Sequence, residues 1–85
     1  MEPLSNLPNI GKELEKQLQE VNVQNIEDLK ALGTEATWLK IQEIDSSACI
    51  HRLYALEGAI LGIKKSEIET SRKEELREFY RWHKK

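Results

Sequence analysis

The chain is poor in residues that cross-link a fold or break helices. Its 85 residues include one cysteine, two prolines and 6% aromatic residues. The lone Cys49 excludes an internal disulfide bond. Both prolines precede Gly11, so no later residue removes a backbone donor from a helix. Most of the chain after Gly11 can therefore be helical.

Long hydrophobic runs are also absent. The most apolar stretch, residues 48–63, is 16 residues long and is interrupted by His51, Arg52 and Glu57. A membrane-spanning helix needs about 20 mostly apolar residues. The N-terminus lacks the positive end followed by an apolar run that marks a signal peptide. We therefore expect a cytoplasmic protein with no membrane contact.

The composition is that of one small folded domain. Hydrophobic residues make up 39% of the chain and charged residues 33%, which is too apolar for a disordered segment. A domain of this size buries only about 60 to 65% of its unfolded surface, so dimerisation would add useful stability. We expect residues 1–85 to form a single domain, with an N-terminal extension over 1–6 and a frayed C-terminus over 82–85.

Apolar residues recur at spacings of three and four, and alternating strand patterns are absent. The pattern predicts an all-α fold, a compact domain of five helices. They cover about 11–20, a short segment before Gly33, a third segment ending at Asp45, about 46–61, and 70 onward. The expected helix caps and left-handed stops are Asn9, Asn22, Asn25, Gly33, Thr34 and Asp45.

The fourth helix is apolar nearly all round and should be the central one. One stripe of it is almost free of side-chain bulk, formed by Ala55, Gly58, Ala59 and Gly62. A glycine inside a helix costs about 1 kcal/mol relative to alanine, so Gly58 implies close packing. We favour packing within the domain over a contact between subunits.

The last helix has three chemically different faces. An apolar face with Leu76, Phe79, Tyr80 and His83 should dock on the core. A basic stripe carries Lys73, Arg77, Arg81 and Lys84. It is either a solvated face, a surface for an acidic protein or a surface for nucleic acid.

Several segments together resemble the C-terminal domain of the TfoX (Sxy) family. The most specific is Tyr54-Ala55-Leu56-Glu57-Gly58-Ala59-Ile60, and the resemblance also includes Leu7-Pro8-Asn9-Ile10-Gly11, Glu27-Asp28-Leu29, Leu32-Gly33 and Ser47-Ala48-Cys49. The resemblance implies an all-helical module of the SAM or helix-hairpin-helix type, tied to regulators of natural competence in bacteria. Fuller regulators of this kind carry the domain behind a separate N-terminal domain, which we do not expect here.

The segment around Asn9 is the candidate hairpin. DNA-binding hairpins place glycines in this turn so that backbone amides at a helix N-terminus meet a phosphate. Asn9 occupies the first glycine position, so the hairpin is either purely structural or contacts DNA. The candidate contact residues are Asn9, Ile10, Gly11, Lys12 and Lys16. Residues 1–48 carry a net charge of −5 and residues 49–85 a net charge of +3, so the hairpin lies on the acidic half.

Two further residues are candidates for specific contacts. Glu57 is an acid inside an apolar segment and lies about 140° around the helix from Arg52. If it is buried, another cation or backbone donor must satisfy it, so we interpret it as a structural tether rather than a functional acid. Trp82 lies off the apolar face of the last helix. It either contacts a partner, folds back on the domain or is simply exposed.

No set of residues has the spacing of a metal site or a catalytic centre. Cys49 and His51 are two residues apart on a helix and so face different ways, and no base can be named for a cysteine nucleophile. Cys49 is expected to be a small core residue. We expect no enzyme, cofactor, metal or small-molecule substrate. The leading hypothesis is a binding module for a protein partner or a second copy, and the alternative is a regulator that binds DNA.

Overall fold

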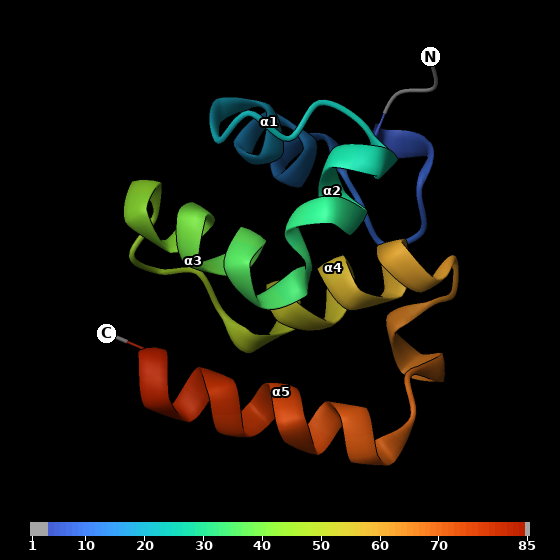
Figure 1. The fold of residues 1–85 in the computed structure, drawn as a ribbon, viewed down its shortest axis with the longest axis vertical. Helices are drawn as coiled ribbons and strands as arrows, with labels where there is room; N and C mark the ends of the chain where they lie inside the picture. Colours follow the sequence, from blue (N-terminus) through green and yellow to red (C-terminus); the bar gives the residue numbers. More distant parts are fainter. Residues whose placement is uncertain (1–3, 85) are drawn as a thin grey trace.

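In the described part of the chain, the helix α4 (Ile50–Leu61) lies among four other α-helices and two short 3-10 helices (Figure 1). The computed structural model describes residues 4–84, apart from the side chain of Ser5. Within this range no residue is in a strand, so the predicted all-helical fold is confirmed. The elements are η1 (Leu4–Asn6), α1 (Lys12–Glu20), α2 (Ile26–Leu32), α3 (Thr34–Ile44), α4 (Ile50–Leu61), η2 (Lys65–Glu67) and α5 (Thr70–His83).

The predicted left-handed stop at Asn22 and the predicted N-cap of α2 at Asn25 are both confirmed. Asn22 follows α1 and has a left-handed φ of 66°. The side chain of Asn25 accepts a hydrogen bond from the backbone N–H of Asp28 at 2.8 Å, and the Asp28 carboxylate accepts from the N–H of Gln24 at 3.1 Å. The first bond satisfies an amide that the first turn of a helix leaves free, and the second fixes the residue that precedes the N-cap.

The start of α3 was predicted incorrectly. Gly33, with a φ of 88°, ends α2 and is also the N-cap of α3. Thr34 is already the first residue of α3 and is 3% exposed. Its hydroxyl donates to Glu57 on α4 instead of capping its own helix. A tertiary contact has therefore replaced the local one.

The start of α4 was also wrong, by four residues: the prediction was Ser46, and the helix begins at Ile50. Asp45 does not cap it. Its carboxylate accepts from the backbone N–H of Ser47 at 3.0 Å, which holds residues 45–49 in a turn. The N-cap of α4 is Cys49, which is half-buried rather than a core residue.

The core lies on both sides of α4, which contacts α2, α3, α5 and η2, so its prediction as the central helix is confirmed. Leu53 and Leu56 of α4 are fully buried. They share the core with buried residues of the other helices, among them Leu18, Leu29, Trp38, Ile41 and Leu76.

Gly58 marks the closest approach of another segment to α4. A Cβ atom there would lie 2.7 Å from the carbonyl oxygen of Ile63 and would also overlap the amide nitrogen of Asn9. The prediction that the small-residue stripe serves packing within the domain is confirmed at this residue.

Helix α5 docks on α3 and α4 through its apolar face. Leu76 is fully buried, and Phe79 and Tyr80 make edge-on ring contacts with Trp38 at 6.0 and 5.8 Å. His83 is exposed and stacks on Phe79, while its backbone oxygen accepts a hydrogen bond from Gln42 at 2.7 Å. The end expected to fray from residue 82 is helical as far as His83.

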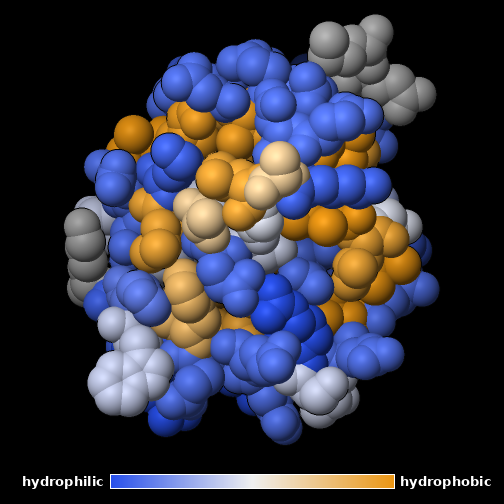
Figure 2. Space-filling model, in the orientation of Figure 1, coloured by the Kyte–Doolittle hydropathy of each residue, from blue (hydrophilic) through white to orange (hydrophobic). Residues whose placement is uncertain are grey.

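On the face shown in Figure 2, hydrophilic residues cover much of the surface, with hydrophobic atoms showing between them. Of the six residues expected to form an N-terminal extension, 1–3 lie outside the described residues, whereas Leu4 is 2% exposed and belongs to the core. None of the helices described here has the length and apolar character needed to cross a bilayer.

Candidate functional site

The turn before α1 is fixed by the loop that follows α4. Asn9 has a left-handed φ of 69°. Its side-chain amide donates to the carbonyl oxygen of Ile63 and accepts from the backbone N–H of Lys65, both at 3.0 Å. The predicted role of Asn9 as a helix cap is therefore wrong. The N-cap of α1 is Gly11, which makes no side-chain cap bond.

A hollow of about 340 Å³ opens beside this turn. Its lining joins the hairpin to α4 and the following loop, with Asn9, Gly11, Lys12, Glu13, Leu14, His51, Arg52, Ala55 and Lys65. Among the candidate hairpin residues, the Ile10 side chain is buried at 5% exposure, whereas Gly11, Lys12 and Lys16 are exposed. Lys12 lines the hollow and Lys16 does not.

The basic residues of α5 divide into two groups. The Nζ of Lys73 lies 5.9 Å from the ring centroid of Tyr54, and the Nε of Arg77 donates to the Tyr54 hydroxyl at 3.3 Å. Arg81 instead pairs with Glu78 at 3.4 Å. Lys84 is exposed at the end of the helix. Of these four residues, Lys73 and Arg77 contact α4.

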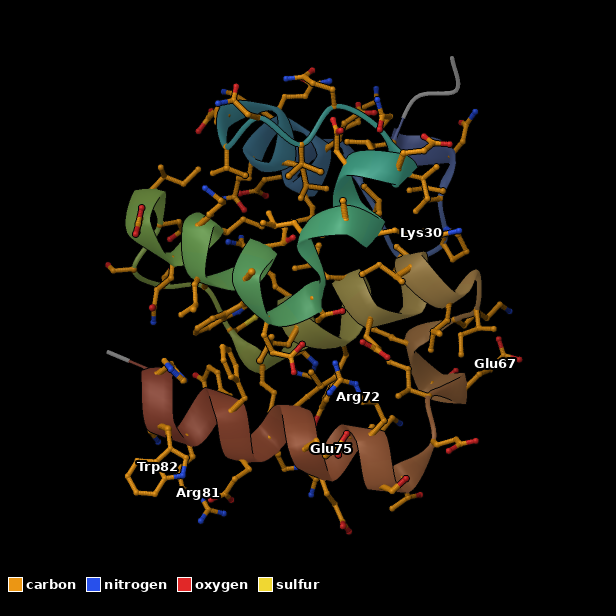
Figure 3. All side chains as sticks on the ribbon, in the orientation of Figure 1. Lys30, Glu67, Arg72, Glu75, Arg81 and Trp82 are labelled. Atoms are coloured by element: carbon orange, nitrogen blue, oxygen red, sulfur yellow. The ribbon has the colours of Figure 1, made fainter. Side chains whose placement is uncertain are left out.

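Glu57 is 8% exposed and is held by two other helices. Its Oε1 accepts from the hydroxyl of Thr34 at 2.8 Å and from the Nη2 of Arg72 at 3.1 Å. Arg72 also makes a two-armed pair with Glu35 at 2.9 and 3.1 Å and contacts Glu75 at 3.3 Å. In Figure 3, Arg72 extends from α5 toward the body of the molecule.

Arg72 thus belongs to an internal cluster rather than to the basic stripe of α5. Hydrogen bonds from Arg72 hold the pKa of Glu35 below its ordinary value, although burial acts in the opposite direction. The bonds to Glu35, and then those to Glu57, raise the pKa of Arg72. The charge of Arg72 is neutralised locally, so it adds little to the field that a partner would meet.

Asp45 is the centre of a second cluster at the turn between α3 and α4. Beyond its bond to Ser47, it accepts from the Nη1 of Arg52 at 2.7 Å and from the Nε2 of Gln17 at 3.0 Å. The hydrogen bonds from Ser47, Arg52 and Gln17 hold the pKa of this carboxyl well below its ordinary range. The cluster links α1 to the beginning of α4.

Trp82 projects from the end of α5 and is 76% exposed (Figure 3). Its indole N–H donates to the carboxylate of Glu78 at 2.9 Å, and the same carboxylate pairs with Arg81. The side chain therefore does not fold back on the domain, and its indole N–H has a hydrogen-bond partner.

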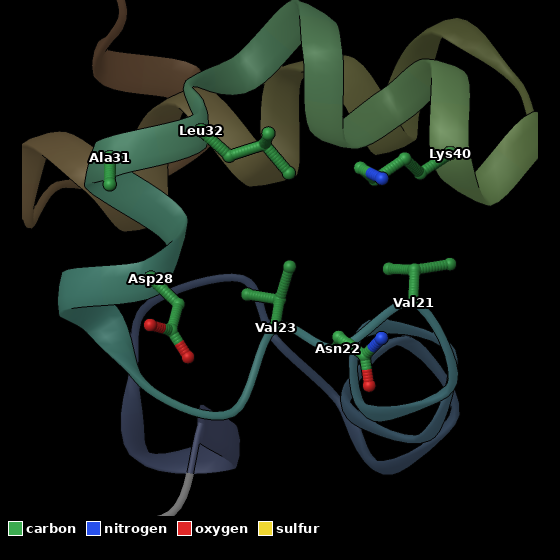
Figure 4. A pocket seen from close by; sticks show the side chains of 7 residues that line it. All are labelled: Val21, Asn22, Val23, Asp28, Ala31, Leu32 and Lys40. Carbon is green, nitrogen blue, oxygen red and sulfur yellow. The ribbon is translucent and has the colours of Figure 1, made fainter.

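A second hollow of about 340 Å³, which we did not predict, lies between the 21–23 turn, α2 and α3 (Figure 4). Val21, Val23 and Leu32 form its apolar wall, with Asp28 and Lys40 at its polar edge. No sequence pattern indicates this hollow, because its walls come from three separate segments. Across residues 4–84, we find no group of three or more His, Cys, Asp or Glu side chains placed to hold a metal ion.

These features define a small all-α domain in which the turn before α1 is held by the loop after α4 and α5 is held by α4. The chain belongs to the TfoX C-terminal domain family, whose model matches residues 1–80. It is similar to Protein Sxy of Escherichia coli (strain K12), with 36% identity over 78 residues. That match covers 92% of this chain but 37% of Sxy, so the chain spans little more than a third of that relative.

Two solved structures share this fold. Both come from Listeria monocytogenes and are described as an uncharacterized protein in a triclinic form and a protein of unknown function in a tetragonal form. Each is 43% identical to this chain, with TM-scores of 0.92 and 0.91, and each match covers 93% of this chain. The matches cover 90% and 96% of the two Listeria chains.

Proposed function

We propose that this chain is a non-enzymatic regulatory domain that binds protein through the C-terminal end of α5. The surface consists of Glu78, Arg81 and Trp82, and we call it the Trp82 surface. Membership of the TfoX C-terminal domain family supports a regulatory role. Such a regulator would act in the cytoplasm, where a lone thiol such as Cys49 stays reduced.

The exposure of Trp82 carries the proposal. Leaving a large indole 76% exposed forgoes the favourable burial of its apolar surface. Tryptophan and arginine are the residues most enriched among those that dominate binding energy at interfaces. The bond from the indole to Glu78 restricts the Trp82 side chain before binding, so less rotamer entropy is lost on association.

A second copy of this chain is the partner that the Trp82 surface fits best. The surface carries a negative charge on Glu78 and a positive charge on Arg81, which are neighbours on α5. In a two-fold dimer with antiparallel α5 helices, Arg81 of one copy meets Glu78 of the other, and the two Trp82 rings meet near the axis. A two-fold interface requires this kind of self-complementarity.

Sedimentation velocity tests the proposal directly. We expect the wild type to shift from monomer to dimer between about 5 and 500 µM, the range in which a modest interface associates. The Trp82→Ala variant should remain monomeric across that range. Leu61→Ala is the matched control because Leu61 is another exposed large apolar residue, at 53%, and lies on α4.

Two results would overturn the proposed dimer. One is a wild-type protein that stays monomeric throughout. The other is equal loss of dimer in the Trp82→Ala and Leu61→Ala variants, which would mean that no particular surface is used. Circular dichroism of each variant verifies that the helices are intact.

A further inference from the structure

Cations from both halves of the sequence meet on one side of the molecule around two rings. The cations come from the start of α1, from the segment after α4 and from α5, and both rings belong to α4. We call this surface the basic face, and it consists of Lys12, His51, Tyr54, Lys65, Lys73 and Arg77.

Contacts and a shared hollow connect these residues. Lys12, His51 and Lys65 line the hollow beside the hairpin turn. The ring of His51 lies edge-on to that of Tyr54, with 6.4 Å between centroids. Tyr54 in turn contacts Lys73 and Arg77 of α5. The basic face is therefore continuous from the N-terminus of α1 to the first two turns of α5.

The lysines and the arginine of the basic face keep their charge available. Within the described residues, no ion pair of 4.0 Å or less involves any of them. By contrast, Arg52, Arg72 and Arg81 are each paired with carboxylates. Glu13 is the acid that lines the hollow, and its side chain is 83% exposed and 4.0 Å from Arg52.

The hairpin end also offers backbone donors. Gly11 is exposed, and a Cβ atom added there would meet nothing within 4 Å, so the space in front of α1 is open. The first amides of a helix lack partners within the helix and carry partial positive charge. These donors add to the field of the cations but do not make the site by themselves.

We propose that the basic face binds the sugar-phosphate backbone of nucleic acid. Three of its four cations are lysines, which bind phosphate as compact point charges, and Arg77 adds a guanidinium fork that matches phosphate geometry. Cations, a tyrosine hydroxyl and open backbone amides are the groups with which proteins contact the phosphates and sugars of a nucleic acid. The proposal concerns a surface separate from the Trp82 surface and is independent of it.

The test is fluorescence anisotropy of a labelled DNA duplex at about 25 and about 150 mM NaCl, because binding driven by phosphates weakens as salt rises. The variants are Lys12→Glu, Lys65→Glu, Lys73→Glu and Arg77→Glu. Each should raise the dissociation constant by about 3- to 10-fold at low salt and reduce the slope of log affinity against log salt by about 1.

Lys40→Glu is the matched control. Lys40 is exposed on α3 and lines the other hollow (Figure 4). Its substitution by glutamate changes the net charge by the same amount as each substitution on the basic face. We expect its affinity for the duplex to stay within about 2-fold of the wild type, since its charge lies off the basic face.

Three results would overturn the proposal. The first is no binding of the duplex at low salt. The second is a loss with Lys40→Glu equal to that of the basic-face variants, which would indicate attraction by net charge alone. The third is tight binding of labelled poly-glutamate by the wild type without binding of the duplex, which would assign the face to an acidic protein.

Discussion

Glu57 and Gly58 are adjacent residues of α4 that hold different parts of the chain. The carboxylate of Glu57 binds Thr34 at the start of α3 and Arg72 of α5. The missing side chain of Gly58 leaves room for Asn9 and for the carbonyl of Ile63. Two positions on one helix turn thus connect the hairpin, α3 and α5.

Replacing Glu57 by glutamine tests the first of these contacts. The glutamine side chain keeps one acceptor oxygen but lacks the negative charge that balances Arg72 at this buried position. We expect the free energy of unfolding in urea to fall by about 2 kcal/mol. Glu75→Gln is the control, because Glu75 contacts the same arginine with a side chain that is 69% exposed, and it should cost less than about 0.5 kcal/mol. Equal losses would show that burial of Glu57 is not what matters.

Replacing Gly58 by alanine tests the close approach of Asn9 and Ile63 to α4. In an ordinary helix interior this change stabilises by about 0.5 to 1 kcal/mol. Here the new Cβ would overlap Asn9 and approach the Ile63 oxygen, so we expect a loss of about 1 to 3 kcal/mol in urea unfolding. Asn9→Ala removes one of the two obstacles. The double variant should therefore lose less than the sum of the single changes, and strict additivity would contradict the close contact.

Sequence reasoning reached part of this arrangement. The helical angle between Arg52 and Glu57 ruled out a local pair, and Arg52 does bind Asp45 instead. That the cation for Glu57 would be Arg72 could not be predicted, because Arg72 is 15 residues away on another helix. Partners that tertiary packing brings together leave no periodic signal in the sequence.

Among the elements, the connection between α3 and α4 depends most on one side chain. Asp45 binds Ser47 in the turn, Arg52 in the first turn of α4 and Gln17 on α1. It fixes the direction in which the chain enters the central helix. The sequence predicted that Asp45 ends α3, but a cap and a turn-forming aspartate have the same local signature, so the start of α4 was placed too early.

Acid should weaken this connection. The bonds to Asp45 lower its pKa from an ordinary value of 3.8, so as pH falls the unfolded chain takes up this proton before the folded chain does. The stability that these bonds contribute is complete above the ordinary pKa of 3.8 and is lost as pH falls from there through the lowered pKa of the folded chain. Urea unfolding between pH 7 and about 3 should therefore show a smaller acid loss for Asp45→Asn than for the wild type. Identical losses would contradict the role of this carboxylate.

At the scale of the molecule, folding redistributes the charge that the sequence divides in two. The hairpin belongs to an acidic half of net charge −5, which argued against phosphate binding there. Folding brings Lys65 and His51 of the other half beside Lys12. It also removes Arg72 from the surface charge by pairing it with Glu35 and Glu57. The charge around a surface position therefore does not follow from counting charges along the chain.

The all-helical class and the central position of α4 could be predicted, because both follow from the spacing of apolar residues. The surfaces could not, because each one joins side chains from separate helices. Trp82 is the exception. Its position off the apolar face of α5 follows from helical geometry alone, and the structure shows it 76% exposed.

The quenching of tryptophan fluorescence by acrylamide tests the proposed Trp82 surface most directly. Trp38 is fully buried and Trp82 is 76% exposed, so the quenchable emission comes from Trp82, and the Trp82→Phe variant isolates Trp38. We expect the quenchable fraction to fall as the protein is concentrated from about 5 to 500 µM, because dimer formation covers the indole. A Trp82 that remains equally quenchable across that range, at concentrations where sedimentation shows a dimer, would contradict the account.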